Sequence, residues 1–187
     1  YKRQGVPMAG VPYHSVEGYL RRMIEQGHRV AVCEQVQDPK EAKGVVDRAV
    51  TRVLTPGTLV DDTLLDDGAA NEVTAVAVEG DVAALATVEL STGSFEVTTV
   101  SADRAVDEIA RIAPSEVLYD DDDTPQQLVD AIRALDDIAL TPRAGWSFGR
   151  GDAAALLRDH YGVNSLAGFG WDDDEPALGP AGALIRY

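Results

Sequence analysis

The spacing of apolar residues near the start of the chain predicts an amphipathic helix over Ser15–Gln26. Apolar side chains recur there at positions i, i+3, i+4, i+7 and i+8, a spacing that places them on one face of a helix. The residues of this face are Val16, Tyr19, Leu20, Met23 and Ile24. Ser15 suits the beginning of the helix and Gly27 its end. Two strands are expected next, over Arg29–Glu34 and Arg48–Leu54, where short apolar or alternating runs are rich in Val.

A second set of patterns, from residue 71 onward, predicts an antiparallel meander followed by alternating helices and strands. The meander strands are expected over Glu72–Val78, Val82–Leu90 and Ser94–Val100. The later elements are a helix over Ala102–Ala113, a strand over Glu116–Tyr119, a helix from the Thr124-Pro125 start to Leu135, a strand over Ile138–Leu140, and helices over Asp152–Tyr161 and Pro176–Tyr187. Residues 59–70 have the composition of a linker. This order is typical of a ribonuclease-H-like α/β domain.

Charge divides the chain at the same linker. Residues 1–58 contain nine Lys or Arg and six Asp or Glu, a balance of +3. Residues 59–187 contain seven Arg, no Lys and 26 Asp or Glu, a balance of −19. The first segment can approach phosphates, whereas the second is repelled by them. Acidic runs such as Asp120–Asp123 resemble the surfaces of halophilic proteins and predict a salt-loving source; a metal-binding acidic loop is the less favoured alternative.

Composition excludes several classes of protein. No apolar run is long enough to span a membrane, and no signal peptide is visible. The single cysteine, Cys33, excludes an internal disulfide, favours a cytoplasmic protein, and is expected to be a buried structural thiol. The chain does not begin with Met, so it is expected to be part of a longer protein.

Catalytic motifs are not found in the sequence. It contains no GxxxxGK[ST] phosphate loop, and His14, His28 and His160 lack the spacing of metal ligands. We therefore expect no catalytic residue, metal or cofactor in this chain. One alternative remains open: Glu89 and the Asp120–Asp123 run could supply carboxylates to a two-metal nuclease on the ribonuclease-H-like sheet.

Two long stretches resemble a known family. The string PMAGVPYHSVEGYLRRMIEQGHRVAVCEQVQDP and the later VTRVLTPGT are similar to the mismatch-recognition domain of the bacterial-type MutS family, and ATVELSTGSF, PSEVLYD and LAGFG are similar to its connector domain. The resemblance implies a mixed-sheet partial mismatch-recognition domain over residues 1–58, a linker over residues 59–70, and a ribonuclease-H-like connector domain over residues 71–187.

The resemblance also implies a function for the longer protein. The family recognises mismatched double-stranded DNA, couples this to ATP-driven signalling, forms homodimers and binds the partner MutL. The aromatic Phe-x-Glu motif that members insert beside the mismatch, and the ATPase domain with its ATP and Mg, are expected outside this chain. The chain itself is expected to be no enzyme, but a partial DNA-binding scaffold and a connector.

Site residues follow from the charge and the resemblance together. The turn Pro7–Leu20 is expected to lead rigidly into the first helix near the DNA backbone, with Gly10 allowing an unusual dihedral or a close approach. The candidates for DNA-backbone contact are Lys2, Arg3, Met8, Gly10, His14 and Lys43. The candidates for partner contact are Leu156, Leu157, Tyr161 and Phe169. A protein-interaction module that does not bind DNA in isolation is a further alternative.

Overall fold

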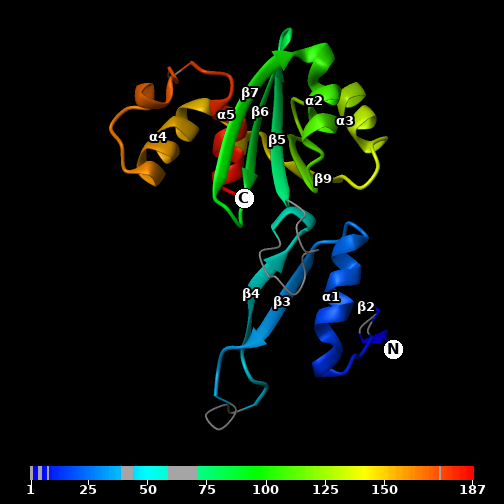
Figure 1. Cartoon of the computed structure of the whole chain (residues 1–187). Helices are drawn as coiled ribbons and strands as arrows, with labels where there is room; N and C mark the ends of the chain where they lie inside the picture. Colours follow the sequence, from blue (N-terminus) through cyan, green and yellow to red (C-terminus); the bar gives the residue numbers. More distant parts are fainter. Residues whose placement is uncertain (1, 4–5, 8, 39–43, 59–70, 173) are drawn as a thin grey trace.

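The computed structural model shows an N-terminal part and a C-terminal part of different construction (Figure 1). It describes residues 2–3, 6–7, 9–38, 44–58, 71–172 and 174–187. The predicted linker over residues 59–70 lies outside the described residues. We use N-terminal part for the described residues up to Thr58 and C-terminal part for those from Asn71 onward.

The N-terminal part consists of one helix against a two-stranded sheet. Strands β1 (Lys2–Arg3) and β2 (Val6–Pro7) form a short antiparallel pair, and the 3-10 turn η1 (Tyr13–Ser15) leads into α1 (Val16–Glu25). Strands β3 (Val30–Gln35) and β4 (Arg48–Leu54) pair antiparallel, and η2 (Pro56–Thr58) follows. Ile24 of α1 and Leu54 of β4 form the small core between helix and sheet.

The C-terminal part is built on a five-stranded mixed sheet. Its strands are β5 (Glu72–Glu79), β6 (Val82–Glu89), β7 (Ser94–Ser101), β8 (Glu116–Asp120) and β9 (Ala139–Arg143), in the spatial order β7-β6-β5-β8-β9. The first three strands pair antiparallel, whereas β8 runs parallel to both β5 and β9. This confirms the mixed α/β fold and the strand arrangement that the sequence predicts.

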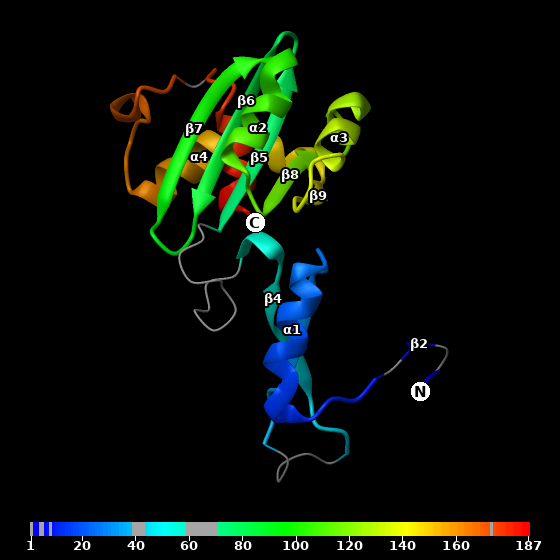
Figure 2. The same cartoon turned by 45° about the vertical axis from the view of Figure 1, so that its right-hand side comes forward.

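Helices cover both faces of this sheet (Figure 2). On one face lie α2 (Ala105–Ile112), which follows η3 (Ala102–Arg104), and α3 (Gln126–Arg133). Their apolar side chains pack on alternate residues of the strands, which point to this face because strand side chains alternate. The largest of these fully buried residues are Leu85, Ile109 and Ile132.

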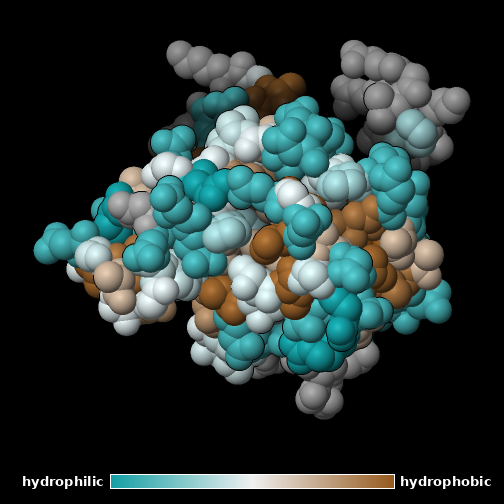
Figure 3. Space-filling model, turned by 90° about the horizontal axis from the view of Figure 1, so that it is seen from above, coloured by the Kyte–Doolittle hydropathy of each residue, from teal (hydrophilic) through white to brown (hydrophobic). Residues whose placement is uncertain are grey.

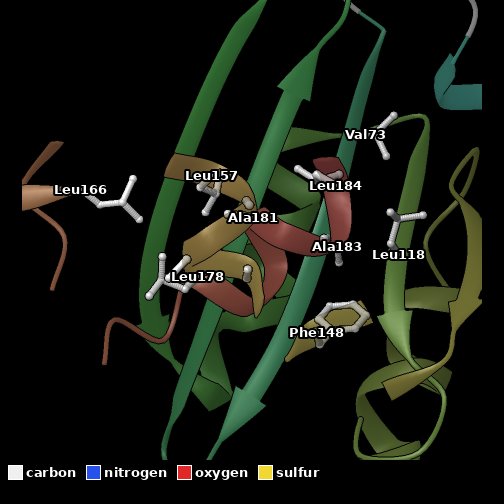
Figure 4. Packing of buried hydrophobic residues seen from close by; sticks show 13 residues of the cluster. Val73, Leu118, Phe148, Leu157, Leu166, Leu178, Ala181, Ala183 and Leu184 are labelled. Atoms are coloured by element: carbon white, nitrogen blue, oxygen red, sulfur yellow. The ribbon is translucent and has the colours of Figure 1, made fainter. Parts of the chain in front are cut away.

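The opposite face carries α4 (Arg150–Tyr161) and α5 (Leu178–Ile185), with η4 (Gly145–Phe148) before α4 and η5 (Ala167–Phe169) after it. Leu157, Leu178 and Leu118 meet in the larger core, shown in Figure 4. The two helices touch closely: a Cβ added to Gly182 would lie 2.4 Å from the Cβ of Ala153. Only glycine therefore allows this helix spacing.

Several predicted details differ from the structure. The predicted apolar face of α1 is only partly buried. Tyr19 and Met23 on this face are exposed, because α1 covers just two strands. Thr124 does not cap α3; its hydroxyl has no hydrogen-bond partner, and Pro125 occupies the N-cap position. The strands β1 and β2 were not predicted, because two-residue strands leave no periodic pattern.

The surface seen from above is mainly hydrophilic, with small separated hydrophobic patches (Figure 3). No helix among the described residues has the length and apolar character needed to cross a membrane.

Cys33 is exposed on β3, so the prediction of a buried thiol was wrong. The reason is that its face of the two-stranded sheet is not the one covered by α1.

Candidate functional site

The predicted DNA-facing turn is an exposed entry to α1. Pro12 begins η1 in an extended conformation, and its carbonyl accepts a hydrogen bond from the Ser15 backbone N–H at 2.9 Å. Gly10, Tyr13 and His14 are all exposed, so the backbone and the imidazole are open to a ligand. Gly10 does not have a positive φ, and a Cβ there would meet nothing within 4 Å. Gly10 therefore does not have the unusual dihedral considered for it, and a close approach of DNA to this position stays a prediction.

The other DNA-backbone candidates are only partly visible. Lys2 and Arg3 form β1, but their side chains are not among the described features. Met8 and Lys43 lie outside the described residues. The structure thus brings Gly10 and His14 to one exposed turn and leaves the other four candidates as predictions.

The predicted partner-contact residues divide between core and surface. Leu157 is fully buried in the core beneath α4, so it is not available to a partner in this structure, and Leu156 is half-buried. Tyr161 and Phe169, by contrast, are 40% and 54% exposed. Their ring centroids lie 5.3 Å apart, which joins the end of α4 to η5 as one aromatic pair. Two neighbouring exposed rings of this kind are typical of contact surfaces between proteins.

The carboxylates considered for a nuclease do not meet. Glu89 ends β6, where it pairs with Glu72 at the beginning of β5, and it lies on the sheet face covered by α2. Asp120 ends β8, at the opposite end of the sheet, and lies on the face covered by α5. Among the described residues, no group of three His, Cys, Asp or Glu is placed to hold a metal ion. The geometry therefore gives no support to two-metal chemistry.

Both acids instead stabilise turns. The Glu89 carboxylate accepts hydrogen bonds from the backbone N–H groups of Ser91 and Thr92, at 3.1 and 2.8 Å. Asp120 Oδ1 accepts from Asp122 N–H at 2.9 Å and Asp123 N–H at 3.3 Å. Hydrogen bonds to the charged form lower a carboxyl pKa. The Ser91 and Thr92 side chains, followed by their backbone N–H groups, lower the pKa of Glu89 to about 2, although burial acts in the opposite direction.

We predict that Glu89→Gln makes the C-terminal part less stable at neutral pH. The folded-state pKa of Glu89 lies below its ordinary value of 4.5, so its contribution is fully present above pH 4.5 and is lost as the pH falls to about 2. The difference between variant and parent chain should shrink over that window in urea unfolding curves. Glu34→Gln, at an exposed position, is the matched control. A difference that persists unchanged at low pH would contradict this role.

The most elaborate polar site joins the two parts of the chain. Gly57 of η2 donates its backbone N–H to Glu116 Oε2 at 3.1 Å. Glu116 begins β8 and is fully buried, as is Thr55 at 3% exposure. A Cβ on Gly57 would lie 2.4 Å from Val73 Cγ2 and 2.9 Å from Glu116 Cβ. Glycine is thus required for η2 to reach the carboxylate.

Two hydroxyl groups also donate to this carboxylate. Glu116 Oε1 accepts hydrogen bonds from Thr141 Oγ1 of β9 at 2.5 Å and from the Tyr187 hydroxyl at 2.7 Å. The Arg143 guanidinium lies over the Tyr187 ring, 5.2 Å from its centroid. Burial, followed by the hydrogen bond to Glu116, raises the pKa of Tyr187 to about 12, while a hydrogen bond with Thr55 acts in the opposite direction. The phenol therefore stays protonated and can donate.

Sequence reasoning did not identify Glu116, Tyr187 or Thr141 as site residues. A signal for Glu116 was available: a glutamate stands at the beginning of the apolar run EVLY, where a buried strand rarely holds a charge. The Thr-Pro-Gly-Thr turn after β4 was the other signal. Neither signal could show that Gly57 in this turn would meet Glu116, because the two residues lie 59 positions apart in the chain.

Comparison with known proteins agrees with this division of the chain. The family model for MutS domain I matches residues 1–63, and that for MutS domain II matches residues 71–187. The DNA mismatch repair protein MutS of Symbiobacterium thermophilum is 41% identical over 186 residues, which cover 97% of this chain. The chain spans 21% of the length of that relative. The Gly57–Glu116 bond thus links a residue of the first match to a residue of the second. The chain belongs to the MutS family of DNA mismatch repair proteins, from which it contains domains I and II.

Proposed function

We propose that the N-terminal part is a DNA-backbone contact region and that the C-terminal part is a connector that does not touch DNA. The observation that carries this proposal is the position of the turn before α1. It is exposed, and it lies at the end of the N-terminal part remote from the C-terminal part (Figures 1 and 2). The residues around it belong to the segment with a balance of +3, whereas the connector belongs to the segment at −19. Phosphates would therefore meet the turn and be repelled by the connector.

The activity of a longer protein would need groups beyond these two domains. We propose that mismatched DNA is recognised with an inserted aromatic residue, that ATP and Mg act in a separate ATPase domain, and that the protein is a cytoplasmic homodimer. The chain contains no Phe-x-Glu motif and no phosphate loop, which supports placing both functions elsewhere. The acidic C-terminal part further supports a salt-loving source, since salt screens such self-repulsion.

The exposed aromatic pair supports a proposal for the partner. We place the contact with MutL at Tyr161 and Phe169. These two large rings, whose centroids lie 5.3 Å apart, are exposed and together form an apolar surface outside the core. Leu156, half-buried on the same helix, stays a candidate for this contact. Leu157 is excluded from it by its burial.

Fluorescence anisotropy with matched and mismatched duplexes, across a salt series, tests the DNA proposal. We expect weak binding that is equal for the two duplexes and falls as salt rises, because phosphate contacts carry no sequence information. Circular dichroism at each salt concentration checks that the chain is folded. His14→Ala should weaken binding, and His160→Ala, an exposed histidine of the connector, is the matched control. Clear preference for the mismatch would show that these domains read the mismatch themselves; no binding at any salt would refute the DNA contact.

A further inference from the structure

The junction around Glu116 directs hydrogen-bond donors at both oxygens of its carboxylate. Among the described residues, three groups donate to it: the Gly57 N–H, the Thr141 hydroxyl and the Tyr187 hydroxyl. All three act as donors towards it, and an ionised carboxylate offers only acceptors. A glutamine of the same shape would keep the Gly57 bond only by turning its NH₂ group towards the Thr141 and Tyr187 hydroxyls, which would then have to rotate and accept.

The same carboxylate touches segments that are far apart in the sequence. Gly57 comes from η2 of domain I, Thr141 from β9 in the sheet, and Tyr187 from the residues after α5. Glu116 therefore joins η2 and Tyr187 through its two oxygens, and displacement of η2 would leave Oε2 without its backbone donor.

Stability alone does not explain a buried acid at this position. Removing a carboxylate from water is costly, and well-packed apolar side chains of similar volume are often equally stable or more stable. What directed hydrogen bonds add is a defined geometry between the groups that they join. The cationic Arg143 lies against the Tyr187 ring and fixes the phenol that donates to the acid.

We propose that Glu116 is a positioning residue that sets the orientation of domain I on domain II and couples that orientation to the end of α5. Through Oε2 it holds η2, and through Oε1 it holds Thr141 and Tyr187. The inference rests on the assignment of the two parts to domains I and II, and not on DNA binding. Failure of the anisotropy experiment would therefore leave it intact.

A distance measurement between the two domains tests the proposal directly. Cys33 is the one cysteine of the chain and is exposed on β3, so a spin label there reports on domain I. A second label at Thr99→Cys, an exposed position of β7, reports on domain II. We expect a single narrow distance distribution for the parent chain. Glu116→Gln should broaden it and shift it towards longer distances.

Two further variants separate positioning from simple loss of folding. Tyr187→Phe removes one donor and leaves the Gly57 bond and the packing of the ring, so it should broaden the distribution even if Glu116→Gln does not fold. Glu96→Gln, an exposed substitution of the same chemistry on β7, should leave the distribution unchanged. Fluorescence of Trp146 and Trp171, both in domain II, should show that this domain stays folded in each variant. A distribution that stays narrow in Tyr187→Phe and in any folded Glu116→Gln would overturn the proposal.

Discussion

Replacing Leu157 by alanine is expected to lower the free energy of unfolding of the chain by about 2–5 kcal/mol. Leu157 is fully buried where α4 meets α5 and the sheet, in the core shown in Figure 4. Truncation removes apolar contacts and leaves a cavity that the tightly packed helices cannot close, because Gly182 and Ala153 already bring them close together. Urea unfolding followed by tryptophan fluorescence measures the change.

Leu156→Ala is the matched control for this prediction. It makes the same chemical change one position earlier on α4, where the side chain is only half-buried, so the loss should be clearly smaller. Equal losses for the two variants would show that Leu157 is not the core residue that we describe. Phe169→Ala should hardly alter stability, since the ring is 54% exposed, whereas the proposed partner contact predicts weaker MutL binding by the longer protein.

Gly57→Ala is expected to have the second largest effect, a loss of about 1–3 kcal/mol through overpacking. The added methyl group would lie 2.4 Å from Val73 Cγ2 and 2.9 Å from Glu116 Cβ, both on strands that cannot easily move. The loss should be visible in the same unfolding measurement. It should also separate η2 from Glu116 and broaden the distance distribution between the domains.

Gly10→Ala is the control. The methyl group added there would have no atom within 4 Å, and the backbone at Gly10 does not have a positive φ. Alanine at such a site leaves stability unchanged or raises it slightly, through a smaller entropy of the unfolded chain. If Gly57→Ala were as harmless as Gly10→Ala, η2 would not be held against β8 as the structure shows.

The fold of the C-terminal part could be predicted largely from periodicity. The strand β7 begins at Ser94 as expected, and β5, β6 and β8 each begin at the predicted residue, because long strands with apolar alternation leave a strong local signal. Helix α2 was expected within Ala102–Ala113 and is found there, but its range alone does not show that Ala105 and Ile109 are buried while Ala110 is exposed. Local patterns predict that a helix forms better than they predict which residues it buries.

The candidate sites were less predictable, because they depend on contacts between distant segments. Tyr161 and Phe169 could be proposed from the sequence, but only packing shows that their rings adjoin while Leu157, four residues before Tyr161, is buried. Glu89 was weighed as a catalytic acid on residue type alone; its two backbone donors show a turn-stabilising role. The meeting of Gly57 with Glu116 depends on how η2 lies against β8, for which the sequence holds no periodic signal.

The hairpin turn between β5 and β6 lies at the end of the C-terminal part that is remote from domain I. Gly57, Val73, Glu116 and Tyr187 all gather where β5 and β8 begin, whereas the turn at Gly80 lies eight residues along β5, about 25 Å away at roughly 3.3 Å per residue. Gly80 has a positive φ of 57°, and a Cβ there would meet nothing within 4 Å. The domain is therefore polarised: one end contacts domain I, and the other offers Gly80 as a place for a genetically fused reporter, between Glu79, which binds Arg150, and Asp81, whose carbonyl accepts from Ala102 N–H.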